Sequence, residues 1–350
     1  MNLQHIADRL GVSRSTVSNA WNRPDHVSAA LRERIFALAE ELGYSGPDPA
    51  ARTLRTGRHL ALGLVFADPL SYAVRDPAAV RFLEGLTMAC ESAEVSLLLI
   101  PALETGAGAL STVARAAVDG VVLYSLPGNS PHLRVATQRQ LPLVVVDEPE
   151  TVPGADWVGL DEHGNLERLG QHLVELGHRR VGVVAFRLDA DGYNGPVLPS
   201  RLARSPYSVQ TRRIAGLAAG LGVAQVPSDA LPIEERSEND RTAGVDAGHA
   251  LLERHPELTA IACTSDVLAL GVLQAARERG LRVPEDLSVS GHDGIAEAAG
   301  AGLTTVHQPL TDKGRTAGQL LLTAKPGGTP RRQVLPAQLR ARRSTGPARA

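Results

Sequence analysis

The sequence contains very few cysteines and no group of residues with metal-ligand spacing. Its two cysteines, Cys90 and Cys263, lie far apart and inside apolar runs of a 350-residue chain. This excludes a disulfide framework and the paired-cysteine spacings of zinc sites. Both cysteines are therefore predicted to be small core residues, and neither a metal nor another cofactor is expected.

Long apolar runs are also lacking. No stretch approaches the ~18 apolar residues that span a bilayer, and the charged start MNLQHIADRLG lacks the apolar segment of a secretory signal. The formal net charge is only −2, so no overall positive charge is available for non-specific nucleic-acid binding. The expectation is a cytoplasmic protein without a membrane partner.

The common sequence motifs of enzymes are missing as well. There is no Walker P-loop, no strand-linked G-x-G-x-x-G, no G-x-S-x-G and no metal-binding group of histidines. His172, His178 and His292 are spread along the chain, and His178 lies in an LGHRR turn where a structural role is expected. The sequence therefore argues against an enzyme.

The first 45 residues have the pattern of a helix-turn-helix. Residues 3–10 carry apolar side chains at helical spacing, and Gly11 allows a tight turn. Ser13 is placed to cap a second helix ending near residue 22. Small Ala7 and inward-facing Val17 complete the spacing that this motif requires.

A third helix is expected between Ser28, its cap, and Gly43, its stop. Three short helices would make a compact domain whose second helix can enter a DNA major groove. Two amphipathic helices around a glycine are also typical of a plain helical hairpin, so this pattern alone leaves both interpretations open.

From residue 60 onward, short apolar runs alternate with longer helical patterns. The helical patterns cover residues 80–93, 165–176, 209–221, 242–252 and 267–279, and the apolar runs include LALGLVF, VDGVVLYS, LPLVVVDE and RRVGVVAF. Continuous apolar strands between helices predict buried parallel sheets. The number of strands favours two lobes, with a ligand bound at the carboxyl ends of the strands.

Both parts of the chain resemble the lactose-repressor (LacI/GalR) family. The stretch LQHIADRLGVSRSTVSNAWNRPDHVSAALRERIFALAEELGY is similar to the family's headpiece nearly position for position. Farther along, ACTSDVLALGVLQAARERGLRVPEDLSVSGHDG and TTVHQPLTDKGRTAGQLLL resemble its effector domain, in the same order. The resemblance implies an all-α helix-turn-helix headpiece and an α/β two-lobed, periplasmic-binding-protein-like domain with parallel sheets and three crossovers.

The implied domains are a DNA-binding headpiece over 1–45, a hinge over 46–59, and an effector-binding and dimerisation domain over 60–350. Within the last domain, an N-lobe is expected over about 60–159 and 309–327, and a C-lobe over about 160–306 and 330–345.

The resemblance also implies which residues contact DNA. Arg14, Ser15 and Asn19 fall on base-reading positions, where arginine suits guanine and asparagine suits adenine or guanine edges. Neighbouring polar residues are expected at phosphates, where they set the register of the complex: Asn2, Ser13, Thr16, Ser18, Asn22, His26 and Ser28. His26 is equally understood as an ordinary surface histidine.

Residues 46–59, GPDPAARTLRTGRH, are a linker on composition alone. The resemblance implies a short helix that folds only on the operator, with Leu54 wedged into a central base step of the minor groove. Arg52 and Arg55 would then contact phosphates. The alternative is an ordinary tether in which Leu54 is a buried anchor.

A small-molecule effector is implied between the two lobes. The resemblance gives Arg213 and Asp293 as the main pair, a donor fork and an acceptor that suit a polyhydroxyl ligand such as a sugar or nucleoside. The further candidates are Asp266, Ser265, Asp161, Tyr72 and Asp76. Asp266 is equally understood as a helix cap, and Asp161 as a residue that hydrogen-bonds within the crossover.

The chain departs from the family near this expected site. It has His292 where an aromatic is usual, Ser265 where asparagine is frequent, Asn165 in place of a glycine, and an inserted loop over 187–208. The ligand class is therefore not carried over from the family.

The expected function is an effector-controlled transcriptional regulator, a repressor, that binds a pseudo-palindromic double-stranded DNA operator as a homodimer. The C-terminal RARRSTGPARA has no heptad pattern, which favours a dimer over a tetramer. The alternative function is a solute- or sugar-binding protein without a DNA role, and the headpiece and the missing export signal argue against it.

Overall fold

The computed structural model describes residues 3–46, 59–102, 109–223, 231–325 and 327–349. The chain divides into two compact units, residues 1–59 and 60–350. Within the described residues, no helix is both long enough and apolar enough to cross a membrane. In the same part of the chain, His, Cys, Asp and Glu side chains form no group of three or more that could hold a metal ion.

The first unit consists of three helices joined by short turns. They are α1 (Leu3–Leu10), α2 (Arg14–Asn22) and α3 (Ala29–Glu41), with a short 3₁₀ turn η1 (Pro24–His26) before α3. Ser13 accepts a hydrogen bond from the backbone N–H of Thr16 at 3.0 Å, and Ser28 caps α3 in the same way. The two predicted caps and the glycine turn at Gly11, where φ is 66°, are confirmed.

These helices pack around a small apolar core that includes Ile6, Ala7, Val17 and Ile35, all fully buried. Trp21 of α2 extends the core, with its ring edge-on to Phe36 at 5.0 Å and to Tyr44 at 5.8 Å between centroids. Ala7 and Val17 face inward as the sequence predicts, which leaves the polar side of α2 free to contact a partner.

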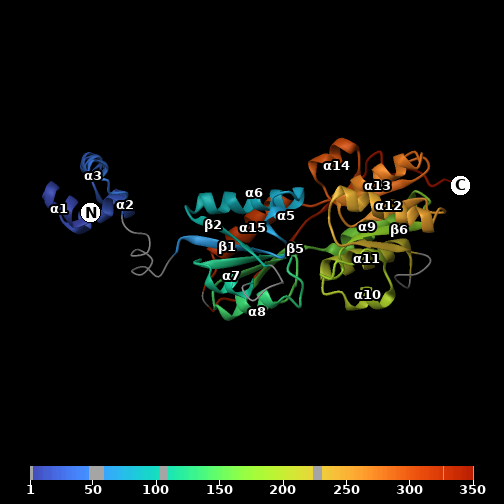
Figure 1. Ribbon diagram of the computed structural model, residues 1–350, viewed down its shortest axis with the longest axis horizontal. Helices are drawn as coiled ribbons and strands as arrows, with labels where there is room; N and C mark the ends of the chain where they lie inside the picture. The colour runs from blue at the N-terminus through green and yellow to red at the C-terminus, as the bar shows by residue number, and fades with distance from the viewer. Residues whose placement is uncertain (1–2, 47–58, 103–108, 224–230, 326, 350) are drawn as a thin grey trace. The chain divides into compact units, whose positions relative to one another are not determined.

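The first lobe of the second unit is a six-stranded parallel sheet in the order β12-β5-β4-β3-β1-β2. Its helices α6 and α15 cover one face, and α7 and α8 cover the other (Figure 1). The strands are β1 (Ala61–Phe66), β2 (Ser96–Pro101), β3 (Gly120–Tyr124), β4 (Leu143–Val146), β5 (Asp156–Leu160) and β12 (Arg332–Leu335). The helices are α5 (Leu70–Ala73), α6 (Pro77–Ser92), α7 (Ala109–Arg115), α8 (Pro131–Gln138) and α15 (Leu310–Leu322).

The second lobe is a seven-stranded sheet in the order β13-β11-β10-β9-β6-β8-β7. Helices α9 and α11 contribute to the core on one face, and α12 and α13 to the core on the other. The strands are β6 (Val181–Phe186), β7 (Gly195–Pro196), β8 (Ile233–Arg236), β9 (Ala260–Cys263), β10 (Ser288–Asp293), β11 (Thr304–His307) and β13 (Gln338–Arg340). The helices are α9 (Glu162–Glu175), α10 (Pro199–Arg204), α11 (Ser208–Leu221), α12 (Arg241–Arg254), α13 (Asp266–Glu278) and α14 (Ala296–Ala301).

Two details of this sheet correct the sequence prediction. The edge strands β7 and β13 pair antiparallel, so the second sheet is mixed rather than purely parallel. The segment over 330–345, predicted to lie in the second lobe, is divided: β12 pairs with β5 in the first lobe, and only β13 joins the second. The chain crosses between the lobes three times, after β5, β11 and β12.

The expected inserted loop, 187–208, folds as an ordered part of the second lobe. It supplies the edge strand β7 and the helix α10. Arg201 holds it in place, bonding Asp191 within the loop at 2.8 Å and Glu235 of β8.

His178 is buried and hydrogen-bonded to Thr259 and Ser288, which confirms its structural role. Both cysteines are buried and free.

Candidate functional site

A narrow cavity of about 100 Å³ lies between the two lobes, where the parallel strands of both sheets end. This is the position at which open α/β sheets bind ligands, because the loops after neighbouring strands diverge there. The first lobe lines it with Asp68, Tyr72, Asp76, Ala78, Tyr124, Ser125, Asp147 and Glu148. The second lobe and its crossings contribute Phe186, Arg187, Tyr207, Val209, Gln210, Arg213, Asn239, Thr264, Ser265, Asp293 and Gln308.

Hydrogen bonds and an ion pair join the lobes around this cavity. Arg187 of the second lobe pairs with Asp68 of the first at 2.6 Å. Glu148, at the end of β4, accepts hydrogen bonds from the hydroxyl of Ser208 at 3.1 Å and the backbone N–H of Val209 at 3.0 Å. These side chains touch both lobes, so any change in the angle between the lobes must break or remake their contacts.

All three guanidinium nitrogens of Arg213 are hydrogen-bonded to the protein. Its guanidinium bonds both carboxylate oxygens of Glu162, at 2.8 and 3.1 Å, and the carbonyl oxygen of Thr264 at 2.8 Å. Burial opposes ionisation of Glu162, but Arg213 and His292 outweigh it and hold the pKa of that carboxyl well below its usual range. Arg213 therefore forms part of the cavity wall as one half of a buried ion pair.

His292 connects this ion pair to Asp293. Its ring lies 3.3 Å from Glu162 and 3.2 Å from Asp293. Burial and Arg213 disfavour the protonated ring, yet Glu162 and the hydrogen bond with Asp293 outweigh them and raise the pKa of His292 above 6.5. His292 is thus an internal polar link between Glu162 and Asp293.

Lys313 of α15 extends the network into the first lobe. Its side chain is almost fully buried and bonds Asp147 at 2.7 Å and the side-chain oxygen of Gln308 at 2.6 Å. Gln308 lies in a crossing between lobes and donates to Asp293 at 2.8 Å. A chain of hydrogen bonds therefore runs from Asp293 through the crossing to α15.

Three residues of the cavity wall have backbone angles that side chains rarely adopt. The φ values are 52° at Ser125, 64° at Asp147 and 126° at Asp293. A backbone conformation of this kind costs about 1–3 kcal/mol per residue, and such residues cluster at ligand sites. There they give side chains directions that an unstrained backbone would not give.

The structure places five of the seven predicted effector residues on the cavity wall. They are Arg213, Asp293, Ser265, Tyr72 and Asp76. Asp76 and Ser265 also cap α6 and α13, and Asn239 donates to the hydroxyl of Tyr72.

Asp266 and Asp161 do not line the cavity. Asp266 is fully buried, and its carboxylate accepts from the backbone N–H groups of Gly294 and Ile295 and the hydroxyl of Thr305. It therefore braces the loop after β10, whereas the cap of α13 is the neighbouring Ser265. Asp161 is exposed and caps α9 through the N–H of Gly164 at 3.0 Å.

Sequence reasoning missed most of the first-lobe wall. Asp147 and Glu148 follow the predicted strand LPLVVVDE, so their place at the carboxyl end of a strand was a usable signal. Gln210, Arg187 and Asn239 lie in loops or at a helix start, and their inward direction depends on tertiary packing that no local pattern encodes.

The headpiece offers a second candidate site on α2. Arg14 and Ser15 are exposed at its first turn, and Asn19 is half-buried one turn later. Asn22 donates to the backbone oxygen of Ser18 at 2.9 Å, so both belong to one turn of the helix. Ser13 and Thr16 bond each other at 2.8 Å at the start of α2, and His26 and Ser28 are exposed before α3.

The remaining predicted DNA contacts cannot be placed in this way. Asn2, Arg52, Leu54 and Arg55 lie outside the described residues.

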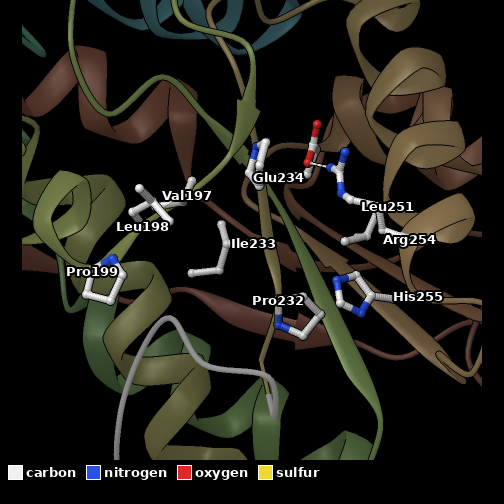
Figure 2. A pocket seen from close by; sticks show the side chains of 10 residues that line it. Val197, Leu198, Pro199, Pro232, Ile233, Glu234, Leu251, Arg254 and His255 are labelled. Carbon is white, nitrogen blue, oxygen red and sulfur yellow. Dashed lines mark hydrogen bonds and ion pairs between the residues drawn. The ribbon is translucent and has the colours of Figure 1, made fainter.

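Another hollow lies in the second lobe, and Figure 2 shows the side chains that line it. None of the predicted effector residues is among them. Apolar side chains from the segment between β7 and α10, from β8 and from α12 surround it, among them Val197, Leu198, Ile233 and Leu251. Glu234 and Arg254 form an ion pair on one side of it. The interlobe cavity, by contrast, has convergent polar groups from two lobes, which is what a specific ligand site requires.

Comparisons with known proteins find relatives for both units of the chain. Residues 2–46 match the model of the bacterial regulatory proteins of the lacI family, and residues 171–345 match a periplasmic binding protein-like domain. An HTH-type transcriptional regulator from Mycolicibacterium smegmatis is 43% identical, covering 99% of this chain and 96% of that protein.

Solved structures show the same architecture over the full length. The complex of the transcriptional regulator CelR with cellobiose matches with a TM-score of 0.69 at 27% identity, covering 98% of this chain and 99% of that one. The lac repressor dimer bound to operator and the anti-inducer ONPF shares the fold, with a TM-score of 0.78 at 24% identity and 99% of both chains covered. The family comprises regulators, not enzymes, and this chain belongs to it: it is a DNA-binding transcriptional regulator of the lacI family.

Proposed function

We propose that this protein is a repressor whose affinity for a pseudo-palindromic operator is set by a small polyhydroxyl effector, a sugar or related metabolite, bound between the lobes. The observation that carries the proposal is the interlobe cavity itself. It brings together polar groups of two lobes, on a chain whose headpiece matches the lacI-family regulators.

The cavity is small, and contacts that bridge the lobes border it. Its volume of about 100 Å³ lies below the range of about 300–1,000 Å³ typical of ligand pockets, so binding has to displace or replace contacts such as those of Arg187 and Glu148. An effector that binds one lobe angle better than another shifts the population toward it. This difference in affinity is what an effector needs in order to act at a distance.

On the operator, Arg14, Ser15 and Asn19 would read bases, with the polar residues around them on phosphates. The hinge residues Leu54, Arg52 and Arg55 complete the proposed contacts from the part of the chain outside the described residues. The protein would act as a homodimer, because a pseudo-palindromic operator presents two equivalent half-sites.

The test begins with selection of DNA fragments that the purified protein binds, followed by titration of variants. Arg14→Ala should weaken binding to the selected site about ten- to a hundredfold and relax base preference at one position of each half-site, as loss of a bidentate base contact does. Arg34→Ala is the matched control, because Arg34 is an exposed arginine of α3 with the same charge. Full affinity and unchanged preference in Arg14→Ala would contradict the proposed reading head.

A further inference from the structure

Negative charge dominates the wall of the interlobe cavity. Five carboxylates line it, from Asp68, Asp76, Asp147, Glu148 and Asp293, against two guanidinium groups.

The positive groups at the cavity are all occupied. Arg187 is paired with Asp68 and Arg213 with Glu162, and Lys313 behind the wall is bonded to Asp147. A phosphate or carboxylate ligand is normally held by cationic side chains that it neutralises. On the described lining, each cation that could do so already has a carboxylate partner.

Helix N-termini at the cavity are occupied in the same way. Asp76 accepts from the N–H of Ala79 at the start of α6, at 3.1 Å. Glu148 accepts from the N–H of Val209 at the start of α11, and Asp293 from the N–H of Asp266 at the start of α13, at 3.4 Å. Helix N-termini are ready-made anion sites, and these three hold anions of the protein itself.

Three polar atoms on the lining remain without a partner among the described residues. They are buried, and they comprise one carboxylate oxygen of Asp76, the side-chain oxygen of Gln210 and the Nε of Arg187. Two of them need a donor and one needs an acceptor. A hydroxyl group both donates and accepts, whereas a phosphate only accepts at these positions and an ammonium only donates.

The acidity of the wall agrees with this geometry. Burial, and then the nearby charge of Asp293, raise the pKa of Asp76 to about 7. Burial raises the pKa of Glu148 to about 7, with Asp147 adding to the shift against the hydrogen bonds from α11. The wall therefore already resists the negative charge that it holds, and a ligand anion would add to the repulsion.

We propose that the cavity selects an uncharged polyhydroxyl ligand and rejects its phosphorylated and carboxylated derivatives, with Asp76 of the first lobe and Gln210 of the second accepting hydrogen bonds from its hydroxyl groups. This inference rests on the proposed function, because it assumes that the effector binds in this cavity.

Binding of matched probes to the full-length protein tests it. The probes are ribose with ribose 5-phosphate, and glucose with glucose 6-phosphate and glucosamine, and binding is followed by thermal unfolding and by calorimetry. A neutral probe should raise the melting temperature, since ligands of the native state stabilise it, and its phosphate should bind at least tenfold more weakly. A phosphate or amine that binds as tightly as its neutral parent, or no rise with either neutral sugar, would overturn the inference.

A pair of variants shows whether the carboxylate of Asp76 is responsible for binding the neutral probe. Asp76→Asn keeps the cap of α6, since asparagine caps equally well, but should weaken the neutral probe about tenfold or more. Glu253→Gln, which removes an exposed carboxylate of α12, should leave binding unchanged. Unchanged binding in Asp76→Asn would count against the proposal.

The same probes, added to the complex with operator, separate this inference from the proposed function. If a phosphorylated sugar changes operator affinity, the regulator proposal stands and the selection of neutral ligands fails. If a neutral sugar binds but operator affinity does not change, the proposed control fails while the ligand selection stands.

Discussion

Glu148 belongs to the first lobe but depends on the second for its environment. Its side chain is buried and held by Ser208 and Val209 across the cavity. Burial raises the pKa of this carboxyl to about 7, although a carboxylate is the better acceptor for these donors. The folded protein therefore keeps a proton on this carboxyl over a pH range in which the unfolded chain has lost it, and stability becomes sensitive to pH.

The sign of this effect follows from the two pKa values. Between the unfolded value near 4.5 and the folded value near 7, the native state holds the proton that the unfolded state has lost. Stability should therefore fall as the pH rises through this range, by up to about 1.4 kcal/mol per pH unit. Glu148→Gln should flatten the curve, because the amide accepts the same hydrogen bonds without titrating. Urea unfolding at pH 5, 6, 7 and 8 measures it.

The pKa of Asp76 is raised in the same direction. The Glu148→Gln variant should therefore keep part of the fall in unfolding free energy with pH, and the double variant with Asp76→Asn should keep less of it. Glu253→Gln serves again as the exposed control. A single variant with the full slope of the parent protein would show that Glu148 does not titrate across this range.

At single positions, the sequence predicted which residue types gather at the cleft better than where their side chains point. Asp161 and Glu162 are adjacent, yet Asp161 is an exposed cap while Glu162 is buried against Arg213. Asp266 and Ser265 are adjacent as well, and only the serine lines the cavity. A helix start sends consecutive side chains in different directions, and the packing of other elements decides which one faces inward.

Among the elements, β8 shows why hydrophobic patterns miss some buried strands. Its sequence, Ile-Glu-Glu-Arg, has the composition of a surface loop, but all four residues are buried. Arg201 from the inserted loop neutralises Glu235, and Arg236 and Arg254 neutralise Glu234. The strands β1, β3 and β4 were predictable because their continuous apolar sequences are those expected of buried strands. The glutamates of β8 also need Arg201 and Arg254, which are distant in sequence, and no local pattern reveals those ion pairs.

Glycines allow the helices α6 and α15 to pack closely against each other. A Cβ on Gly85 of α6 would collide with the backbone oxygen of Thr311 at the start of α15, and one on Gly314 with the oxygen of Phe82. Overpacking of this kind typically costs about 1–3 kcal/mol. Gly85→Ala should therefore destabilise the second unit by about that amount, and chemical unfolding measures the loss.

Gly300→Ala provides the matched control for this prediction. Gly300 lies in α14 with no atom near the position of an added Cβ, so alanine there should stabilise slightly, by about 0.5–1 kcal/mol. Equal effects of the two substitutions would show that helix propensity, rather than close contact between α6 and α15, determines the outcome.

For the whole molecule, the pair α6–α15 connects the cavity to a surface. Lys313 of α15 is bonded to Asp147 and, through Gln308, to Asp293. Helix α15 packs closely on α6, so the hydrogen-bond network at the cavity is connected through α15 to α6. The outer side of α6 exposes Val80 and Met88, 41% and 42% accessible.

These two side chains lie two turns apart on one face of α6, and exposed apolar positions of this kind favour a protein interface. If this face forms the proposed homodimer, Met88→Glu should yield monomers in sedimentation experiments. Operator affinity should fall by about 10²–10⁴, because the second headpiece no longer binds as part of the same molecule. Leu198→Glu, at the 64% exposed Leu198 of the second lobe, is the control and should remain dimeric. A Met88→Glu protein that sediments as a dimer and keeps its operator affinity would place the dimer contact on another face.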